Sequence, residues 1–324
     1  MSEQREITAK INTAELLKAW EERAERAHGV VVQTLLGAKT DLGCVRENNE
    51  DKFEFFQPDD EDVLALKGSF YAVADGMGGH AAGQIASELA LKTAIKAYYA
   101  EQSPVVEEFL RSAIQQANGL IYDAARAIAE RNGMGTTITA LVIRGEEFFI
   151  AQVGDSRCYR LRGNRIEQLT DDHSWVNEQV KRGALTQDEA EMSPFKNVIT
   201  RSIGNAPYVD VDIITDELRE GDQFLLCTDG LSNEISESDM KEAMQRGSPS
   251  QAAWDLIELA LERGGRDNCS RAWSRWFRYR WQSPPVQTKS PGTRSVTSGP
   301  TDSMIPAASC PSRNGKSSLM PPSR

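Results

Sequence analysis

Short apolar runs alternate along this chain with longer segments in which apolar residues recur every three or four positions. Runs rich in β-branched and aromatic residues predict strands, and the longer periodic segments predict helices. We expect strands at 30–36, 53–56, 69–74, 138–143, 147–153, 158–161, 165–169, 209–214 and 223–227, and helices at 81–99, 104–131, 174–182, 237–245 and 249–263. Because several strands flank pairs of helices, the pattern predicts an α+β protein in which two sheets are covered by helices.

The strand expected at 69–74 ends in an acidic, glycine-rich turn, Asp75-Gly76-Met77-Gly78-Gly79. A carboxylate fixed at a strand end, beside glycines that expose main-chain carbonyls, suits a metal that prefers oxygen ligands. The alternative is an ordinary turn in which the aspartate caps the following helix and the glycines supply the turn geometry. Taken alone, this segment favours the second interpretation.

Other acidic residues occupy similar turns beside predicted strands, and they change that balance. They are Asp51, Asp155, Asp229 and Asp267, each beside a Gly or Asn turn. Several carboxylates meeting at one point would repel one another and raise one another's pKa unless a cation neutralised them. A site with oxygen ligands and no thiolate selects Mg²⁺ or Mn²⁺. Two such ions about 4 Å apart can activate a shared water for in-line displacement at phosphorus.

Eight short motifs follow one another in order between about residues 34 and 268. They are VRENNED (45–51), ADGMGGH (74–80), GMGTT (133–137), GDSR (154–157), LTDDHS (169–174), NVITRSIG (197–204), LLCTDGLS (225–232) and GGRDN (264–268). In this series the chain resembles the metal-dependent Ser/Thr protein phosphatases of the protein phosphatase 2C type (the PPM family), in particular its bacterial branch. The resemblance implies a four-layer α-β-β-α sandwich of two antiparallel sheets flanked by helices, over residues 30–270.

The resemblance also implies roles for individual residues. Asp75 would bridge two metal ions, and Arg46, which could clamp phosphate oxygens bidentately, would bind the substrate phosphate. A third, weaker metal site would lie between Asp155 and Asp229, and residues 170–201 would form a mobile flap beside the site. The metal ligands implied in total are Asp51, Asp75, Gly76, Asp155, Asp229 and Asp267.

The reaction that the resemblance implies is hydrolysis of phosphoserine and phosphothreonine in proteins, with Mn²⁺ or Mg²⁺ as cofactor. A water between the two metals would attack phosphorus in line, and no phosphoenzyme would form. The expected partners are phosphorylated proteins, such as the targets of a Ser/Thr kinase, and the expected state is a monomer.

Histidine adds little to this chemistry. Some family members carry a His directly after the Asp-Gly pair, but this chain has Met77 there, so no general acid is assigned. We expect His80 to cap or pack against the start of the helix and His173 to order the flap. Because Met77 replaces this histidine, an alternative function also remains: a catalytically impaired phosphatase-like module that binds or regulates a partner.

Composition limits the other function classes. Hydrophobic residues make up 40% of the 324 residues, and no apolar run approaches the roughly 20 residues that span a bilayer. The net charge of −11 argues against nucleic-acid binding. The five cysteines are scattered without a Cys-x-x-Cys pair, which argues against zinc sites and a disulfide framework. We therefore expect a soluble, cytoplasmic protein.

The two ends of the chain differ from the rest. Residues 1–29 read as an amphipathic helical extension. Residues 1–270 contain 28 basic and 47 acidic residues, whereas 271–324 contain nine basic residues and one acid, with half of the six tryptophans in 271–281. This tail is either a genuine basic extension, disordered beyond residue 281, or the product of a reading frame that shifted after Ser270; we favour the frame shift.

Overall fold

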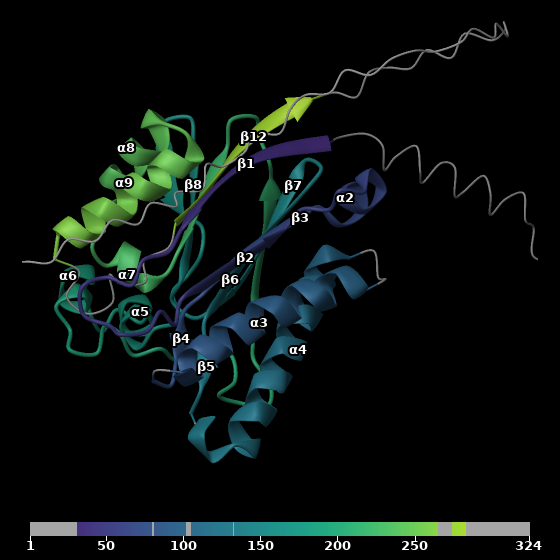
Figure 1. The fold of residues 1–324 in the computed structure, drawn as a ribbon. Coiled ribbons are helices and arrows are strands. Elements are labelled where there is room, and N and C mark those ends of the chain that lie inside the picture. Colours follow the sequence, from purple (N-terminus) through teal and green to yellow (C-terminus); the bar gives the residue numbers. More distant parts are fainter. Residues whose placement is uncertain (1–30, 80, 102–104, 132, 265–273, 283–324) are drawn as a thin grey trace, which may run out of the picture. The chain divides into compact units, whose positions relative to one another are not determined.

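Two five-stranded sheets form the centre of the computed structural model (Figure 1). The strand order in the first sheet is β1 (Val31–Lys39), β12 (Ser274–Gln282), β11 (Gln223–Cys227), β8 (Arg157–Arg162) and β9 (Arg165–Gln168). The order in the second is β10 (Asp212–Glu217), β7 (Glu147–Val153), β6 (Ile138–Arg144), β3 (Ser69–Ala74) and β2 (Lys52–Phe56). Each of these neighbouring pairs is antiparallel. A third, two-stranded ribbon joins β4 (Gly76–Met77) to β5 (Gly135–Thr136).

Helix pairs cover the outer faces of both sheets (Figure 1). Helices α3 (Ala81–Ala100) and α4 (Val106–Ala127) pack on the second sheet, and α8 (Glu237–Arg246) and α9 (Pro249–Glu262) pack on the first. One buried apolar cluster lies under each helix pair, and a third, which includes Tyr71, Phe148 and Phe224, lies between the sheets. Three cores between four layers confirm the predicted α-β-β-α sandwich.

The structure describes residues 31–79, 81–101, 105–131, 133–264 and 274–282. The predictions made for the N-terminal helix at 1–29, for His80, for Asp267 and for the tail beyond residue 282 lie outside these ranges. Within the tail, residues 274–282 form β12 between β1 and β11. A strand therefore forms within the tail, whichever origin the tail has.

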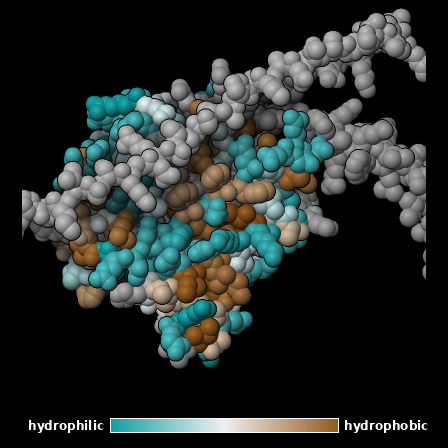
Figure 2. Space-filling model, in the orientation of Figure 1, coloured by the Kyte–Doolittle hydropathy of each residue, from teal (hydrophilic) through white to brown (hydrophobic). Residues whose placement is uncertain are grey.

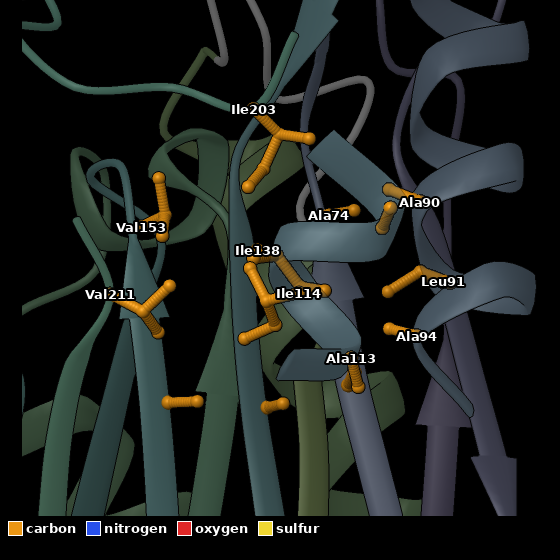
Figure 3. Close-up of a cluster of buried hydrophobic side chains, with 14 of the residues drawn as sticks. Ala74, Ala90, Leu91, Ala94, Ala113, Ile114, Ile138, Val153, Ile203 and Val211 are labelled. Carbon is orange, nitrogen blue, oxygen red and sulfur yellow. The ribbon is translucent and has the colours of Figure 1, made fainter. Parts of the chain in front are cut away.

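Alanines, more than the larger apolar residues, form the buried side of α3. The larger apolar residues at helical spacing in this segment are Ile85, Leu89, Leu91 and Ile95, but of these only Leu91 is fully buried. The buried face consists mainly of Ala82, Ala86, Ala90 and Ala94. Figure 3 shows Ala90, Leu91 and Ala94 facing Ala113 and Ile114 of α4. Small side chains let two helices and a sheet approach one another closely, so the packing depends on residues that a hydrophobicity pattern ranks low.

Several boundaries differ from the prediction. The strand expected at 209–214 begins and ends three residues later, as β10, because its first apolar residues, Val209 and Val211, are buried in the core on the α4 side. Among the apolar residues at helical spacing in the predicted helix 104–131, Leu120 of α4 and the flanking Val105 and Ile128 are exposed. Three short helices were not predicted: α2 (Glu61–Lys67), α6 (Gln187–Glu191) and α7 (Asp229–Ser232).

The segment 170–201 leaves the first sheet after β9 and carries two short helices, α5 (Trp175–Lys181) and α6. A β-bridge between Ser174 and Ile199 joins the two ends of this segment. The space-filling view in Figure 2 shows hydrophilic side chains interspersed with hydrophobic ones across one face of the protein. In the part of the chain that the structure describes, none of the helices has the length and apolar character needed to cross a membrane.

Candidate active site

Four of the predicted acidic residues lie where strands of both sheets end at one edge of the sandwich. The pairing of Lys52 with Ala74 sets Asp51, before β2, beside Asp75, after β3. The pairing of Cys227 with Arg157 sets the end of β11, and therefore Asp229, beside the turn that carries Asp155. The hydroxyl of Thr228 donates to Asp51 Oδ2 at 2.8 Å, which ties the end of β11 to the start of β2.

Asp75 and Asp229, two residues of intermediate exposure, form a pair of carboxyl groups at this edge. Burial raises the pKa of Asp75 well above its usual value, and the charges of Asp51, Asp229 and Asp155 raise it further, so Asp75 donates a hydrogen bond to Asp229. Burial also raises the pKa of Asp229; the bond from Asp75, the Gly230 N–H and the nearby arginines offset this only in part. Without a cation, one proton is therefore shared where two carboxylates would repel.

Two threonines fix the main chain of Asp75. The Asp75 carbonyl accepts hydrogen bonds from Thr136 Oγ1 at 2.7 Å and from the Thr137 N–H at 2.9 Å, and the Asp75 N–H donates to Thr137 Oγ1 at 2.9 Å. Thr137 Oγ1 also bonds to Ser156 Oγ at 2.8 Å. These threonines end the GMGTT motif, but no role was expected for them from the sequence.

Gly76, the first residue of β4, lies against the first turn of α3. A Cβ at this position would lie 2.1 Å from the Gly83 carbonyl oxygen and 2.8 Å from that of Glu50. The Glu50 carbonyl also accepts a short hydrogen bond from Ser87 Oγ. Only glycine therefore fits, because any side chain would push α3 away from the residues that precede β2.

Asp155 sits in the tight turn between β7 and β8. Gly154 has φ +110°, and a Cβ there would lie 2.5 Å from the methyl group of Thr137. Asp155 is buried, and burial together with the charges of Asp229 and Asp172 raises its pKa well above the usual value. Its Oδ1 atom has no hydrogen-bond partner among the described residues. A buried carboxylate oxygen without a partner is the kind of atom that a cation would satisfy.

Two arginines bring positive charge to the same edge. Arg46 is exposed, and its charge lies close enough to lower the pKa of Asp229. Arg157 is held by Asp172, to which Nε and Nη2 donate at 3.0 and 2.6 Å, and by the hydroxyl of Tyr159. The sequence analysis assigned a role to Arg46 but none to Arg157.

The oxygen atoms at this edge suit a hard divalent cation that retains some of its bound water molecules. They include carboxylate oxygens from both sheets, together with the main-chain oxygen at Gly76. Among the described residues no three His, Cys, Asp or Glu side chains already meet as a metal cage. Mg²⁺ keeps several waters and commonly uses only one or two carboxylates, so the pair Asp75–Asp229 and the nearby Asp155 suit Mg²⁺ or Mn²⁺.

A cleft of about 810 Å³ opens beside the acidic residues. Asp155, Arg157 and Asp229 line one part of it. Lys196 and Asn197 of the segment 170–201 line another, together with residues of α7 and the turn before α8. The segment predicted as a flap therefore forms a wall of the cleft that reaches the acidic residues.

Neither Met77 nor His80, the two positions considered for a general acid from the sequence, supplies one in the described structure. Met77 is a thioether, which cannot donate a proton, and His80 lies outside the described residues. His173 is buried at the base of the segment 170–201, bonded to Gly154 and Asp212, and so does not face the cleft as a free acid.

The family model for protein phosphatase 2C matches residues 45–259. The chain belongs to the protein phosphatase 2C family. It is 37% identical over 235 residues to the "Serine/threonine phosphatase stp" of Listeria welshimeri, an alignment that covers 71% of this chain and 91% of that protein. It is 38% identical over 237 residues to the "Protein phosphatase PhpP" of Streptococcus pneumoniae, covering 72% and 94%.

Solved structures of bacterial phosphatases have the same fold. The serine/threonine phosphatase of S. agalactiae aligns with a TM-score of 0.68 and 34% identity, over 76% of this chain and 99% of that one. The catalytic domain of the phosphatase PstP, in complex with two manganese ions, aligns with a TM-score of 0.66 and 32% identity, over 77% and 99%. These relatives confirm that the chain is a bacterial PPM phosphatase, as the motifs indicated.

Proposed function

We propose that this protein hydrolyses phosphoserine and phosphothreonine in other proteins with the help of Mn²⁺ or Mg²⁺. One observation carries the proposal: Asp75, after β3 of the second sheet, and Asp229, after β11 of the first, meet as a hydrogen-bonded pair of carboxyl groups at the edge of the sandwich. Two acidic groups this close repel each other when both are ionised, and a cation between them would offset that cost. The manganese ions of the related PstP domain support the same metal chemistry.

We assign the metal ligands as the motifs imply. Asp75, with the Gly76 carbonyl beside it, would serve the two central ions, and Asp51 would act next to them. Asp229 would hold one central ion together with Asp267, and would share a third, weaker ion with Asp155. The electrostatic coupling of Asp75 with Asp51, Asp155 and Asp229 supports this grouping.

Two bound cations would supply an activated water and neutralise negative charge on the phosphoryl group in the transition state. The chain's own residues position the reactants. Thr136 and Thr137 hold the main chain of Asp75 so that its carboxyl group faces Asp229. Arg46, exposed beside Asp229, would bind two phosphate oxygens and orient phosphorus for in-line attack.

We further propose that the polypeptide around the phosphorylated residue lies in the 810 Å³ cleft, against the segment 170–201. This cleft begins at Asp155 and Asp229, so a peptide in it would present its phosphate to the metal site. The substrates would be phosphoproteins made by a Ser/Thr kinase, and the enzyme would act as a cytoplasmic monomer.

Phosphate release from a phosphothreonine peptide tests this function. The intact chain should release phosphate with Mn²⁺ and lose the activity in excess EDTA. Asp229→Asn should remove at least 99% of the activity, whereas Asp123→Asn, the same change at an exposed position on α4, should leave it intact. Inactive wild-type protein that still melts cooperatively would contradict the proposal and favour a phosphatase-like binding module.

A further inference from the structure

His173 connects three parts of the structure through its main chain and its ring. Its N–H donates to the Gly154 carbonyl at 2.9 Å, and its own carbonyl accepts from the Thr200 N–H at 2.8 Å. The first bond reaches the turn after β7, and the second reaches the returning end of the segment 170–201. The residue therefore lies where that segment joins the body of the domain.

The imidazole ring extends this connection. Nδ1 accepts a hydrogen bond from the Gly154 N–H at 3.0 Å, so the ring proton lies on Nε2, which donates to Asp212 Oδ2 at 3.1 Å. Asp212 begins β10, and its Oδ1 accepts from Arg201 Nη1 at 2.5 Å. The ring is thus fixed from both sides by groups that leave it one tautomer.

The residue that depends on this arrangement is Asp155, directly after Gly154. The Oδ1 atom of Asp155 is buried and has no hydrogen-bond partner among the described residues. The direction of this carboxylate is therefore set mainly by the turn that carries it. That turn is held on one side by the Thr137 methyl group against Gly154 and on the other by the His173 ring.

We propose that His173 is a positioning residue for the outer metal site: by holding the Gly154 N–H, its ring directs the Asp155 carboxylate toward Asp229. The same ring joins the turn to the base of the segment 170–201, so the outer metal and this wall of the cleft are organised by one side chain. The inference rests on the proposed metal-binding function.

Two amide substitutions separate the two bonds of the ring. In His173→Asn, the amide oxygen takes the place of Nδ1 and can still accept from Gly154 N–H, whereas the bond to Asp212 is lost. In His173→Gln, the amide nitrogen reaches the place of Nε2 and can still donate to Asp212, whereas the bond to Gly154 is lost. Both variants carry a neutral amide, so a difference in their Mn²⁺ affinity shows whether the bond to Gly154 or the bond to Asp212 matters for metal binding.

The experiment is calorimetric titration of Mn²⁺ into the wild type and both variants, each checked for a cooperative thermal transition. We expect His173→Gln to weaken the weakest class of Mn²⁺ sites by about tenfold to a hundredfold, the usual effect of losing a group that orients a metal ligand. The tighter sites should be unchanged, and His173→Asn should bind all classes within about threefold of the wild type. If His173→Gln does not fold, His173→Phe replaces it, because a phenyl ring keeps the shape but cannot accept from the Gly154 N–H, and it should weaken only the weakest class.

The outcomes distinguish this inference from the proposed function. Absence of Mn²⁺ binding by the wild type would overturn the metal site itself and the inference with it. Normal binding by the wild type, with equal affinities in the Asn and Gln variants or with all site classes weakened alike, would overturn the positioning role alone. Where His173→Phe replaces the Gln variant, unchanged affinity for the weakest class would also overturn the positioning role.

Discussion

Asp75 and Thr137 are joined by two hydrogen bonds in opposite directions: the Asp75 N–H donates to the side-chain Oγ1 of Thr137, and the Thr137 N–H donates to the Asp75 carbonyl, both at 2.9 Å. The threonine methyl group meanwhile packs against Gly154, next to Asp155. One buried side chain thus positions the main chain of two acidic residues that lie 80 positions apart in sequence.

We expect Thr137→Val to impair both stability and activity. The substitution keeps the shape but removes the acceptor of the Asp75 N–H and the bond to Ser156, which should cost about 1–3 kcal/mol of unfolding free energy. Urea denaturation measures this loss, and phosphate release measures the activity. Thr215→Val, the same change at an exposed position on β10, should alter the free energy by less than about 0.5 kcal/mol. Equal effects of the two substitutions would show that Thr137 has no special role.

Asp229→Asn should stabilise the protein that lacks metal while it abolishes the stabilisation by metal. The variant removes one of two neighbouring acidic groups whose coexistence is costly. In EDTA its melting temperature should equal or exceed that of the wild type. Added Mn²⁺ should raise the wild-type melting temperature strongly and that of the variant little. A variant that melts well below the wild type in EDTA would argue for a structural role instead.

Gly76→Ala should be among the most destabilising alanine substitutions in the chain. Its Cβ would lie 2.1 Å from the Gly83 carbonyl oxygen, so β4 and α3 would have to separate, at a cost of about 3 kcal/mol or more. In Gly119→Ala, within α4, the new Cβ meets no atom within 4 Å and should stabilise by about 0.5–1 kcal/mol. Both values come from urea denaturation, and similar changes in the two variants would refute the close packing at Gly76.

Stability should fall in weak acid because of His173. Burial lowers the pKa of this ring, although the bond to Asp212 opposes the effect, and the charges of Arg201 and Lys181 add to it. Below the usual histidine pKa of about 6.5 the unfolded chain takes up a proton that the folded chain resists. The contribution of neutral His173 to the free energy of unfolding is therefore complete above about pH 6.5 and is lost as the pH falls below that value. Asp212 remains ionised over this range: burial raises its pKa, but the hydrogen bonds from His173 and Arg201 lower it overall.

The measurement is urea denaturation of the wild type and His173→Asn at pH 7.5 and 5.5. The wild type should lose more stability between the two than the variant, which has no titrating ring at this place. The same pH dependence in both proteins would show that another group is responsible.

The sequence predicted those elements whose hydrophobic pattern is unambiguous. The strands β3, β7 and β11 have the predicted bounds, since each is a continuous or alternating apolar run ended by a polar turn. The hydrophobic pattern did not identify the buried face of α3, because alanines pack there in place of the larger apolar residues. The start of α6 carried a readable signal, since Thr186 and Glu189 form a capping box.

For the site, the sequence identified the acidic residues but not the groups that hold them. Motif spacing placed Asp51, Asp75, Asp155 and Asp229 at strand ends, and the pairing of those strands brings them to one edge. The roles of Thr137, Thr228 and His173 depend on contacts between residues far apart in the chain. Such contacts appear only when the two sheets are placed face to face.

The most direct test of the account is to locate bound Mn²⁺ by anomalous diffraction from crystals of the intact protein grown with the metal. The account predicts anomalous peaks within coordination distance of Asp75 and Asp229, with a further, weaker peak beside Asp155. Peaks elsewhere on the surface, or an Asp75–Asp229 pair that still shares its hydrogen bond at saturating Mn²⁺, would contradict it.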